Sequence, residues 1–422
     1  MSSPHFIWKT IVCDLREKLG LTPCFERENE TTANTSLVFH AGRLMALNEG
    51  GHPYALRVMC EGVIETVGKM SFDGQMKTGY TAHPKQHIST GKLYGFGRQL
   101  GVKPHITIYV LDAEGKLERQ FPVDMGRHVF MHDFAITENY VVFLDLPMVL
   151  KPENFLKGVF PVVFDGTLGA RMGVLPLDAT DGSSIRWFDM PEARKIPWTQ
   201  HYFCRAQEQA FMAFHVLNAW EENLEVSGTT NAVLKVVTCD MFDIKMDEFE
   251  MNEEQPPGRL AQPHTTTLNL DTGTVTRASI LPQPPKEGLD FPQIRRALVG
   301  RKNRYGFFSG LDTKGLASLV KLDLEAATPE TAEVGRIDHG DWLGGEALFV
   351  PVHGDGGGEE DDGFLISFVS PKDCGSSELR VWDAKTMNPN PVATVKLPAR
   401  VPLGLHTIFL GDAELATQKR QQ

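Results

Sequence analysis

The chain has 422 residues, of which 42 are Lys or Arg and 54 are Asp or Glu, so its formal net charge is −12. A hydrophobic fraction of 41% and a charged fraction of 23% exclude a disordered or collagen-like chain. The acidic excess argues against nucleic-acid binding, which normally uses a basic face. The chain contains 39 Gly and 26 Pro, which favours many short strands joined by turns over long helices.

The first thirty residues are expected to form a separate lead-in, with one main domain over residues 31–422. Ile7, Ile11, Leu15 and Leu19 recur at helical spacing, which predicts an amphipathic helix. Its apolar face either packs on the core or lies on a membrane surface. Charged residues interrupt any signal-peptide core here, and no apolar run approaches the roughly 20 residues of a membrane-spanning helix. Six scattered cysteines fit a reducing compartment better than a disulfide framework. The protein is therefore expected to be soluble or peripheral to a membrane, and not secreted.

After about residue 33 the sequence changes to short β-rich runs, and one device recurs in them. A strand-like run reaches an Asp in a tight turn at residues 111–115, 270–273, 322–323 and 382–383. The intervals between these aspartates are 159, 52 and 60 residues, and 159 is close to three times 53. A weak period of this length, built of hairpins, is typical of propeller blades, although any meander repeats its turns. Three segments, 252–263, 281–292 and 353–363, are expected to be solvated loops between blades.

Four histidines share a setting in or beside apolar, strand-like stretches: His83, His132, His215 and His406. A buried imidazole without a partner is costly, so a set of them invites a shared partner such as Fe, Cu, Zn or Ni. Their spacings of 49, 83 and 191 residues do not fit a local zinc site, whose ligands lie closer together. Ligands spread this widely need a fold whose distant segments converge on one axis, as a propeller does. Other histidines are expected on the surface or in turns, namely His40, His52, His87, His105, His128, His201, His264, His339 and His353.

Four motifs stand around these histidines in a fixed order: TAHPK at residues 81–85, MHDFAITE at 131–138, FHVLNAWEE at 214–222 and RVPLGLH at 400–406. Together they closely resemble the motifs of the carotenoid cleavage oxygenases. The resemblance covers roughly residues 31–415 and is closest to plant and algal members of the 9-cis-epoxycarotenoid dioxygenase type. Family members carry a longer opening segment before the Glu49 region. The resemblance therefore implies either a fragment or a shortened member whose ring is incomplete at the N-terminus.

The resemblance implies an all-β fold, a seven-bladed β-propeller with a dome of loops and helices over an axial iron site. It assigns one Fe(II) per chain to four ligands, His83, His132, His215 and His406. It also implies three carboxylates that orient the ligand imidazoles, and two of them match Glu49 and Glu346. The third falls on Asp290, where the family usually has Glu. Because Asp is one methylene shorter, either the backbone must approach its partner or a water must bridge the gap.

The implied activity is oxidative cleavage of a conjugated C=C bond in a carotenoid or apocarotenoid, with O2 as co-substrate and two carbonyl products. Stilbene-type cleavage or retinoid isomerisation on the same scaffold, and a catalytically impaired remnant that binds pigment or iron, remain the alternatives. The expected partner is an apolar polyene, with no nucleic acid and no obligate protein partner. The aromatic-rich stretch Phe155–Phe164 is either core or a patch that contacts a membrane. A plastid or cytoplasmic location is expected.

Overall fold

The structure is a computed structural model that describes residues 32–98, 103, 106–151, 154, 162–191, 210–226, 228–242, 260–312, 315–372, 375–402 and 404–419. The predicted helix over residues 7–19 and most of the Phe155–Phe164 stretch lie outside these residues. Among the helices of the described part, none is long and apolar enough to cross a bilayer.

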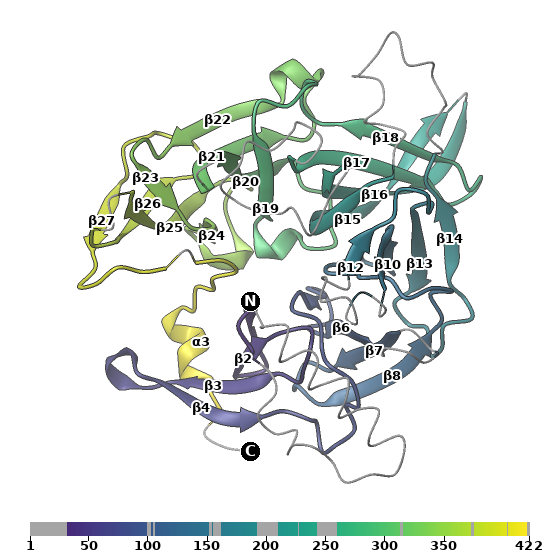
Figure 1. Ribbon diagram of the computed structural model, residues 1–422, viewed down its shortest axis with the longest axis horizontal. Helices are drawn as coiled ribbons and strands as arrows, with labels where there is room; N and C mark the ends of the chain where they lie inside the picture. Colours follow the sequence, from purple (N-terminus) through teal and green to yellow (C-terminus); the bar gives the residue numbers. More distant parts are fainter. Residues whose placement is uncertain are drawn as a thin grey trace.

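Six antiparallel sheets are arranged around a common axis as the blades of a propeller (Figure 1). The first contains β1 (Ser36–His40), β2 (Arg43–Leu47), β3 (Tyr54–Val58) and β4 (Ile64–Lys69). The second contains β5 (Lys85–Gln86), β6 (Leu93–Arg98), β7 (Ile106–Leu111) and β8 (Leu117–Val123). The third contains β9 (Ala135–Ile136), β10 (Tyr140–Asp145), β13 (Arg171–Pro176) and β14 (Arg186–Asp189), and the hairpin of β11 (Met148–Leu150) and β12 (Val162–Phe164) branches from it.

The three remaining sheets complete the described ring. The fourth contains β15 (Met212–Val226), β16 (Thr229–Met241), β17 (Gln262–Asn269) and β18 (Val275–Ser279). The fifth contains β19 (Gly288–Gln293), β20 (Tyr305–Asp312), β21 (Gly315–Asp323) and β22 (Glu333–Asp338). The sixth contains β23 (Trp342–Gly344), β24 (Leu348–Pro351), β25 (Gly363–Pro371), β26 (Glu378–Asp383) and β27 (Ala393–Lys396). The all-β propeller is thus confirmed with six blades in the described residues, while the seventh blade and the dome stay predictions.

The recurring aspartates occupy the same place in four of these blades. Each lies at or just after the end of the third strand in the order of its sheet. Asp112 follows β7, Asp271 follows β17, Asp323 ends β21 and Asp383 ends β26. Asp112 shows why the residue suits this turn, because its Oδ1 accepts the backbone N–H of Glu114 at 3.0 Å. Short polar side chains stabilise tight turns in this way. The period of 50 to 60 residues is confirmed for the last two intervals, but the interval of 159 residues spans two blades and not three, because only the third sheet lies between Asp112 and Asp271.

Two of the three predicted loops are partly wrong. Residues 262–263 begin β17, and residues 288–292 belong to β19. Proline is tolerated in β19 because Pro292 lies in an irregular stretch where the register with β20 shifts between Asp290 and Gln293. The third predicted loop is a connection except for its last residue, Gly363, which begins β25. The buried Arg295 anchors this loop by donating to the carbonyls of Gly354 at 2.8 Å and Glu359 at 3.0 Å.

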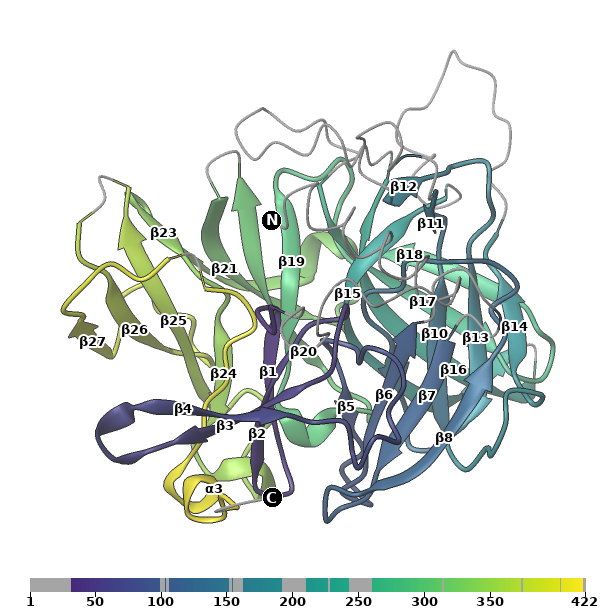
Figure 2. The same cartoon turned by 60° about the horizontal axis from the view of Figure 1, so that its bottom comes forward.

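The C-terminal segment runs from the sixth sheet back to the first. Gly404 accepts the backbone N–H of Glu346 at 3.1 Å, and Lys419 donates its backbone N–H to Gly42 at 2.9 Å. Between these contacts lies α3 (Asp412–Ala416), which Figures 1 and 2 place beside the β1–β4 sheet. This segment therefore links the first and last blades of the described ring.

Four histidines predicted to lie on the surface or in turns are in fact buried: His40, His87, His264 and His339. Two of them are satisfied by backbone groups, since His40 Nε2 lies 2.7 Å from the Asp112 carbonyl and His264 Nδ1 lies 3.0 Å from the carbonyl of Gln262. A histidine with one good partner can be buried as a neutral ring, which is why the prediction failed for them.

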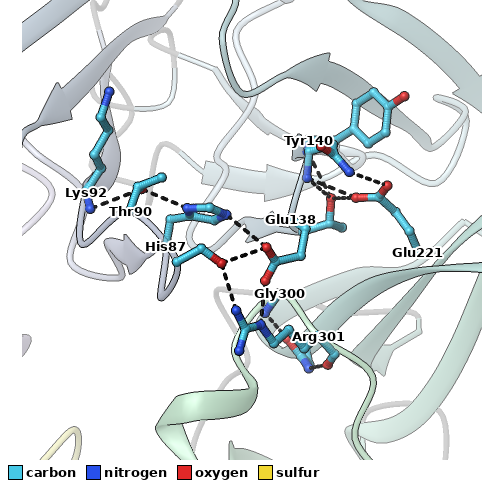
Figure 3. Close-up of polar contacts among 12 residues, drawn as sticks. His87, Thr90, Lys92, Glu138, Tyr140, Glu221, Gly300 and Arg301 are labelled. Atoms are coloured by element: carbon cyan, nitrogen blue, oxygen red, sulfur yellow. Dashed lines mark hydrogen bonds and ion pairs between the residues drawn. The ribbon is translucent and has the colours of Figure 1, made fainter.

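His87 belongs to a polar network that joins loops of three blades (Figure 3). Its Nε2 lies 3.7 Å from Glu138 Oε2, and Glu138 also accepts hydrogen bonds from Ser89 Oγ at 2.8 Å and Arg301 Nε at 2.5 Å. Arg301 in turn donates to Ser89 Oγ at 2.7 Å. The network ties the β5–β6, β9–β10 and β19–β20 connections together, so Glu138 has a structural role.

Candidate metal centre

The four histidines singled out in the sequence lie together on the propeller axis. One ligand nitrogen from each falls within 4.8 Å of those of the others. His83 precedes β5, His132 precedes β9, His215 lies in β15 and His406 follows the sixth sheet, so four different blades contribute. The inference that distant segments converge on one axis is therefore confirmed.

Three of the four imidazoles contact a carboxylate through Nδ1, and the three carboxylates are those singled out in the sequence. The pairs are His132 with Glu49 Oε1, His215 with Asp290 Oδ1 at 2.9 Å, and His406 with Glu346 Oε2 at 3.0 Å. An ionised carboxylate only accepts, so each of these Nδ1 atoms carries the proton. This arrangement fixes the tautomer and leaves each Nε2 as the nitrogen with a free lone pair.

Two of these carboxylates, Glu49 and Glu346, are held in their ionised form. Burial alone would raise the pKa of Glu49, but the hydrogen bond and charge of His132, together with Arg98 at 3.5 Å, lower it overall. Burial likewise opposes ionisation of Glu346, and its contacts with His406 lower its pKa overall. The site therefore presents negative charge behind its imidazoles.

Asp290 reaches His215 directly although its side chain is one methylene shorter than Glu. The register between β19 and β20 shifts immediately after it, and Phe291 adopts a left-handed backbone with φ of 52°. Phe291 also donates its backbone N–H to Asp290 Oδ1 at 2.8 Å. The backbone at Asp290 thus lies close enough to His215 for a direct hydrogen bond, and no water is needed to bridge the shorter side chain. A left-handed non-glycine residue is strained, and such residues concentrate at functional sites.

The histidine cluster has the properties of a metal site. His215 Nε2 is buried without a hydrogen-bond partner, and the Nε2 atoms of His83 and His132 lie only 3.0 Å apart. Burial, followed by the neighbouring histidines, holds the pKa of His83 well below its usual value, so this ring is neutral. Neutral imidazoles with free lone pairs suit Fe, Cu, Zn and Ni, and the four can therefore hold a metal ion.

Two cavities reach the histidines. One has a volume of about 560 Å³, and its wall is mostly apolar, with Phe214, Met241 and Leu316 among its residues. The other, of about 600 Å³, is lined by a mixture of apolar and charged residues, including Lys85 and Asp133. The cavities themselves could not be predicted from the sequence, because their walls come from several blades.

Comparison with known proteins agrees with this geometry. Residues 5–411 match the family model described as retinal pigment epithelial membrane protein. The chain is 34% identical over 401 residues to carotenoid 9,10(9',10')-cleavage dioxygenase 1 of Phaseolus vulgaris, an alignment that covers 92% of this chain and 68% of the relative.

A relative of comparable length is zeaxanthin 7,8(7',8')-cleavage dioxygenase of Crocus sativus, with 34% identity over 393 residues, covering 92% of this chain and 97% of that protein. Among solved structures, the lignostilbene dioxygenase of Pseudomonas brassicacearum shares the fold with a TM-score of 0.72 at 24% identity, over 93% of this chain and 80% of that one. The chain therefore belongs to the carotenoid cleavage oxygenase family and is an oxygen-incorporating oxidoreductase.

Proposed function

We propose that the chain cleaves a conjugated C=C bond of a carotenoid or apocarotenoid with O2, using one Fe(II) bound by His83, His132, His215 and His406. The observation that carries this proposal is the convergence of the four imidazoles within 4.8 Å at the end of an apolar cavity. Bound iron would supply the activation of O2, and the two products are carbonyl compounds.

The protein's own residues hold and orient the site. Imidazoles bind a metal ion in their uncharged form, so Glu49, Asp290 and Glu346 would provide the negative charge that offsets a divalent cation. Each also keeps one imidazole turned with Nε2 toward the axis. Iron held by these four imidazoles would supply the activation of O2, so the protein need not supply a nucleophile.

The apolar cavity provides the surface that a polyene requires. Phe214 and Phe291 line it beside the histidines, and Leu260 and Leu316 extend its apolar wall. A hydrophobic hydrocarbon entering this cavity would lose contact with water and pack against these side chains. The names of the relatives point to carotenoids as the substrate class.

The test is anaerobic loading with Fe(II), followed by O2 and a panel of carotenoids and stilbenes, with aldehyde products identified by mass spectrometry. We expect about one iron per chain and paired carbonyl products from a carotenoid. Cleavage of stilbenes alone would favour the stilbene-type alternative. Iron binding without any product would favour the impaired remnant.

Single substitutions test the ligand set separately. Replacing any of the four histidines with Ala should remove iron, as measured by metal analysis of the purified protein. His353→Ala serves as the matched control because that side chain is 62% exposed and lies outside the cluster, so iron should be retained. Full iron retention in two or more of the four ligand variants would contradict the assignment.

A further inference from the structure

One buried carboxylate, Asp133, contacts the segments that carry three of the four proposed ligands. It is the residue after His132 and is only 2% exposed. Its Oδ1 lies 2.7 Å from Lys85 Nζ, and its Oδ2 accepts the backbone N–H of Val216 at 2.9 Å. Asp133 is not among the carboxylates that contact the histidine rings, so its burial needs another reason.

The contact with Val216 depends on an irregularity of β15. The register between β15 and β16 shifts on both sides of Val216, from Ala213 to Val216 and again from Val216 to Asn218. Bulges of this kind re-aim a side chain and leave a ladder group unpaired. Here the side chain at the irregularity is that of His215. The backbone N–H of the next residue, Val216, donates to Asp133 and not to a carbonyl of β16.

The contact with Lys85 brings in the segment of His83. Lys85 lies two residues after His83 at the start of β5, and its side chain is 20% exposed along the wall of the larger cavity. An isolated buried carboxylate would be strongly disfavoured, and the ammonium group of Lys85 offsets its charge. The ion pair therefore gives the buried carboxylate of Asp133 a charged partner.

We propose that the Lys85–Asp133 pair is a positioning pair, which fixes the segments of His83, His132 and His215 relative to one another. This inference rests on the metal site of the proposed function. Among the described residues, neither side chain hydrogen-bonds to the ring of a ligand, so the pair acts mainly through the backbone that carries the rings. Loss of the pair should loosen the spacing of three imidazoles without removing any of them.

The chemistry of Asp133 identifies the substitution that tests this role. Its carboxylate receives three donors, namely Lys85 Nζ, Val216 N and its neighbour Phe134 N at 2.7 Å. In Asp133→Asn the amide nitrogen would have to face one of these donors, so the contact with Lys85 or with Val216 is lost. Lys85→Met removes the charge from the other side and keeps the aliphatic stem.

A second buried Lys–Asp pair provides the matched control. Lys321 Nζ lies 2.6 Å from Asp361 Oδ2, and both side chains are largely buried between the fifth and sixth sheets. Lys321→Met therefore breaks an ion pair of the same kind away from the four histidines. It should lower the stability of the protein and leave metal affinity unchanged.

The experiment is titration of the metal-free protein with Co²⁺, followed by the visible absorption of the bound ion, with thermal unfolding of the metal-free proteins alongside. We expect Asp133→Asn and Lys85→Met to weaken Co²⁺ affinity by about 10- to 100-fold and to change the absorption spectrum. The proposal would be overturned if folded Lys85→Met bound Co²⁺ with wild-type affinity and an unchanged spectrum. This result would decide the question even if Asp133→Asn did not fold. An equal loss of affinity in Lys321→Met would overturn it too, because the effect would then be general. Cobalt binding is measured without substrate, so a failure of polyene cleavage would refute the proposed function and not this inference.

Discussion

Replacing Asp290 with Asn removes the negative charge that faces His215 and leaves a side chain of nearly the same shape. Asp290 Oδ1 accepts hydrogen bonds from His215 Nδ1 at 2.9 Å and from Phe291 N at 2.8 Å. An amide oxygen can accept both, so Asp290→Asn should fold and keep the local backbone. The bond to His215 then changes from charge-assisted to neutral.

The expected magnitude follows from the strength of these two kinds of bond. Hydrogen bonds to charged groups contribute about 1.5–3 kcal/mol, and neutral ones about 0.5–1.5 kcal/mol. The difference of about 1.5 kcal/mol corresponds to roughly a tenfold weaker binding of metal through His215. Competition with a chelator of known affinity measures this change for Fe(II) or Co²⁺, and the activity on a polyene should fall with metal occupancy.

A second buried Asp–His contact separates this effect from a loss of stability. Asp240 Oδ2 lies 3.5 Å from His264 Nδ1 and also pairs with Arg277, and neither partner belongs to the four-histidine cluster. Asp240→Asn should lower the free energy of unfolding without changing metal affinity. Unchanged metal affinity in Asp290→Asn, or an equal loss in Asp240→Asn, would refute the reasoning.

Four further substitutions test other parts of the fold. Burial lowers the pKa of His339 from 6.5 to about 4, so the unfolded chain takes up the proton first as the pH falls. The free energy of unfolding should therefore fall by about 2 kcal/mol between pH 7 and pH 5 through this group, and denaturant titrations should show a correspondingly smaller pH dependence in His339→Leu. Asn218→Ala should lower the free energy of unfolding by about 2 kcal/mol. The buried amide donates to the Arg301 carbonyl at 2.7 Å and accepts the Gly300 N–H at 3.0 Å, and both bonds are lost. Arg301→Ala breaks the half-exposed ion pair with Glu138 and should lower the free energy of unfolding by less than about 1 kcal/mol. A larger loss in Arg301→Ala than in Asn218→Ala would contradict this. Gln418→Ala should lower the free energy of unfolding by about 1 kcal/mol, since its amide exchanges two hydrogen bonds with Val58, and thermal unfolding that matches wild type would count against this.

The sequence predicted the centre of this protein better than its periphery. His83, His132, His215 and His406 were identifiable because each stands in an apolar motif of fixed order, and their wide spacing required a fold with a common axis. The contact between Asp290 and His215 was not predictable, because it depends on the left-handed backbone of Phe291 and on a register shift. Those features belong to the tertiary structure and have no short sequence signature.

Burial of individual polar residues was also beyond the sequence. His40 lies in a short strand that resembles any surface strand, and it is buried because a carbonyl 72 residues away accepts its Nε2–H. Asp133 stands in the most recognisable motif of the chain, but its role is set by Lys85 and Val216, which come from other blades. In both cases the partner is distant in sequence, and local pattern carries no information about it.

The position of His406 links metal binding to closure of the described ring. His406 is held through Glu346 in the sixth sheet, and the same C-terminal segment continues to Gln418, which bonds Val58 in the first sheet. The other three histidines precede β5, precede β9 or lie in β15. They therefore belong to blades that come earlier in the sequence than the C-terminal segment. A metal bound by all four would therefore connect the C-terminal segment after the sixth sheet with the second, third and fourth sheets. Binding energy at the axis would stabilise the C-terminal contacts, and those contacts would in turn hold the fourth imidazole in place, because a ligand that binds only the closed arrangement shifts the equilibrium toward it.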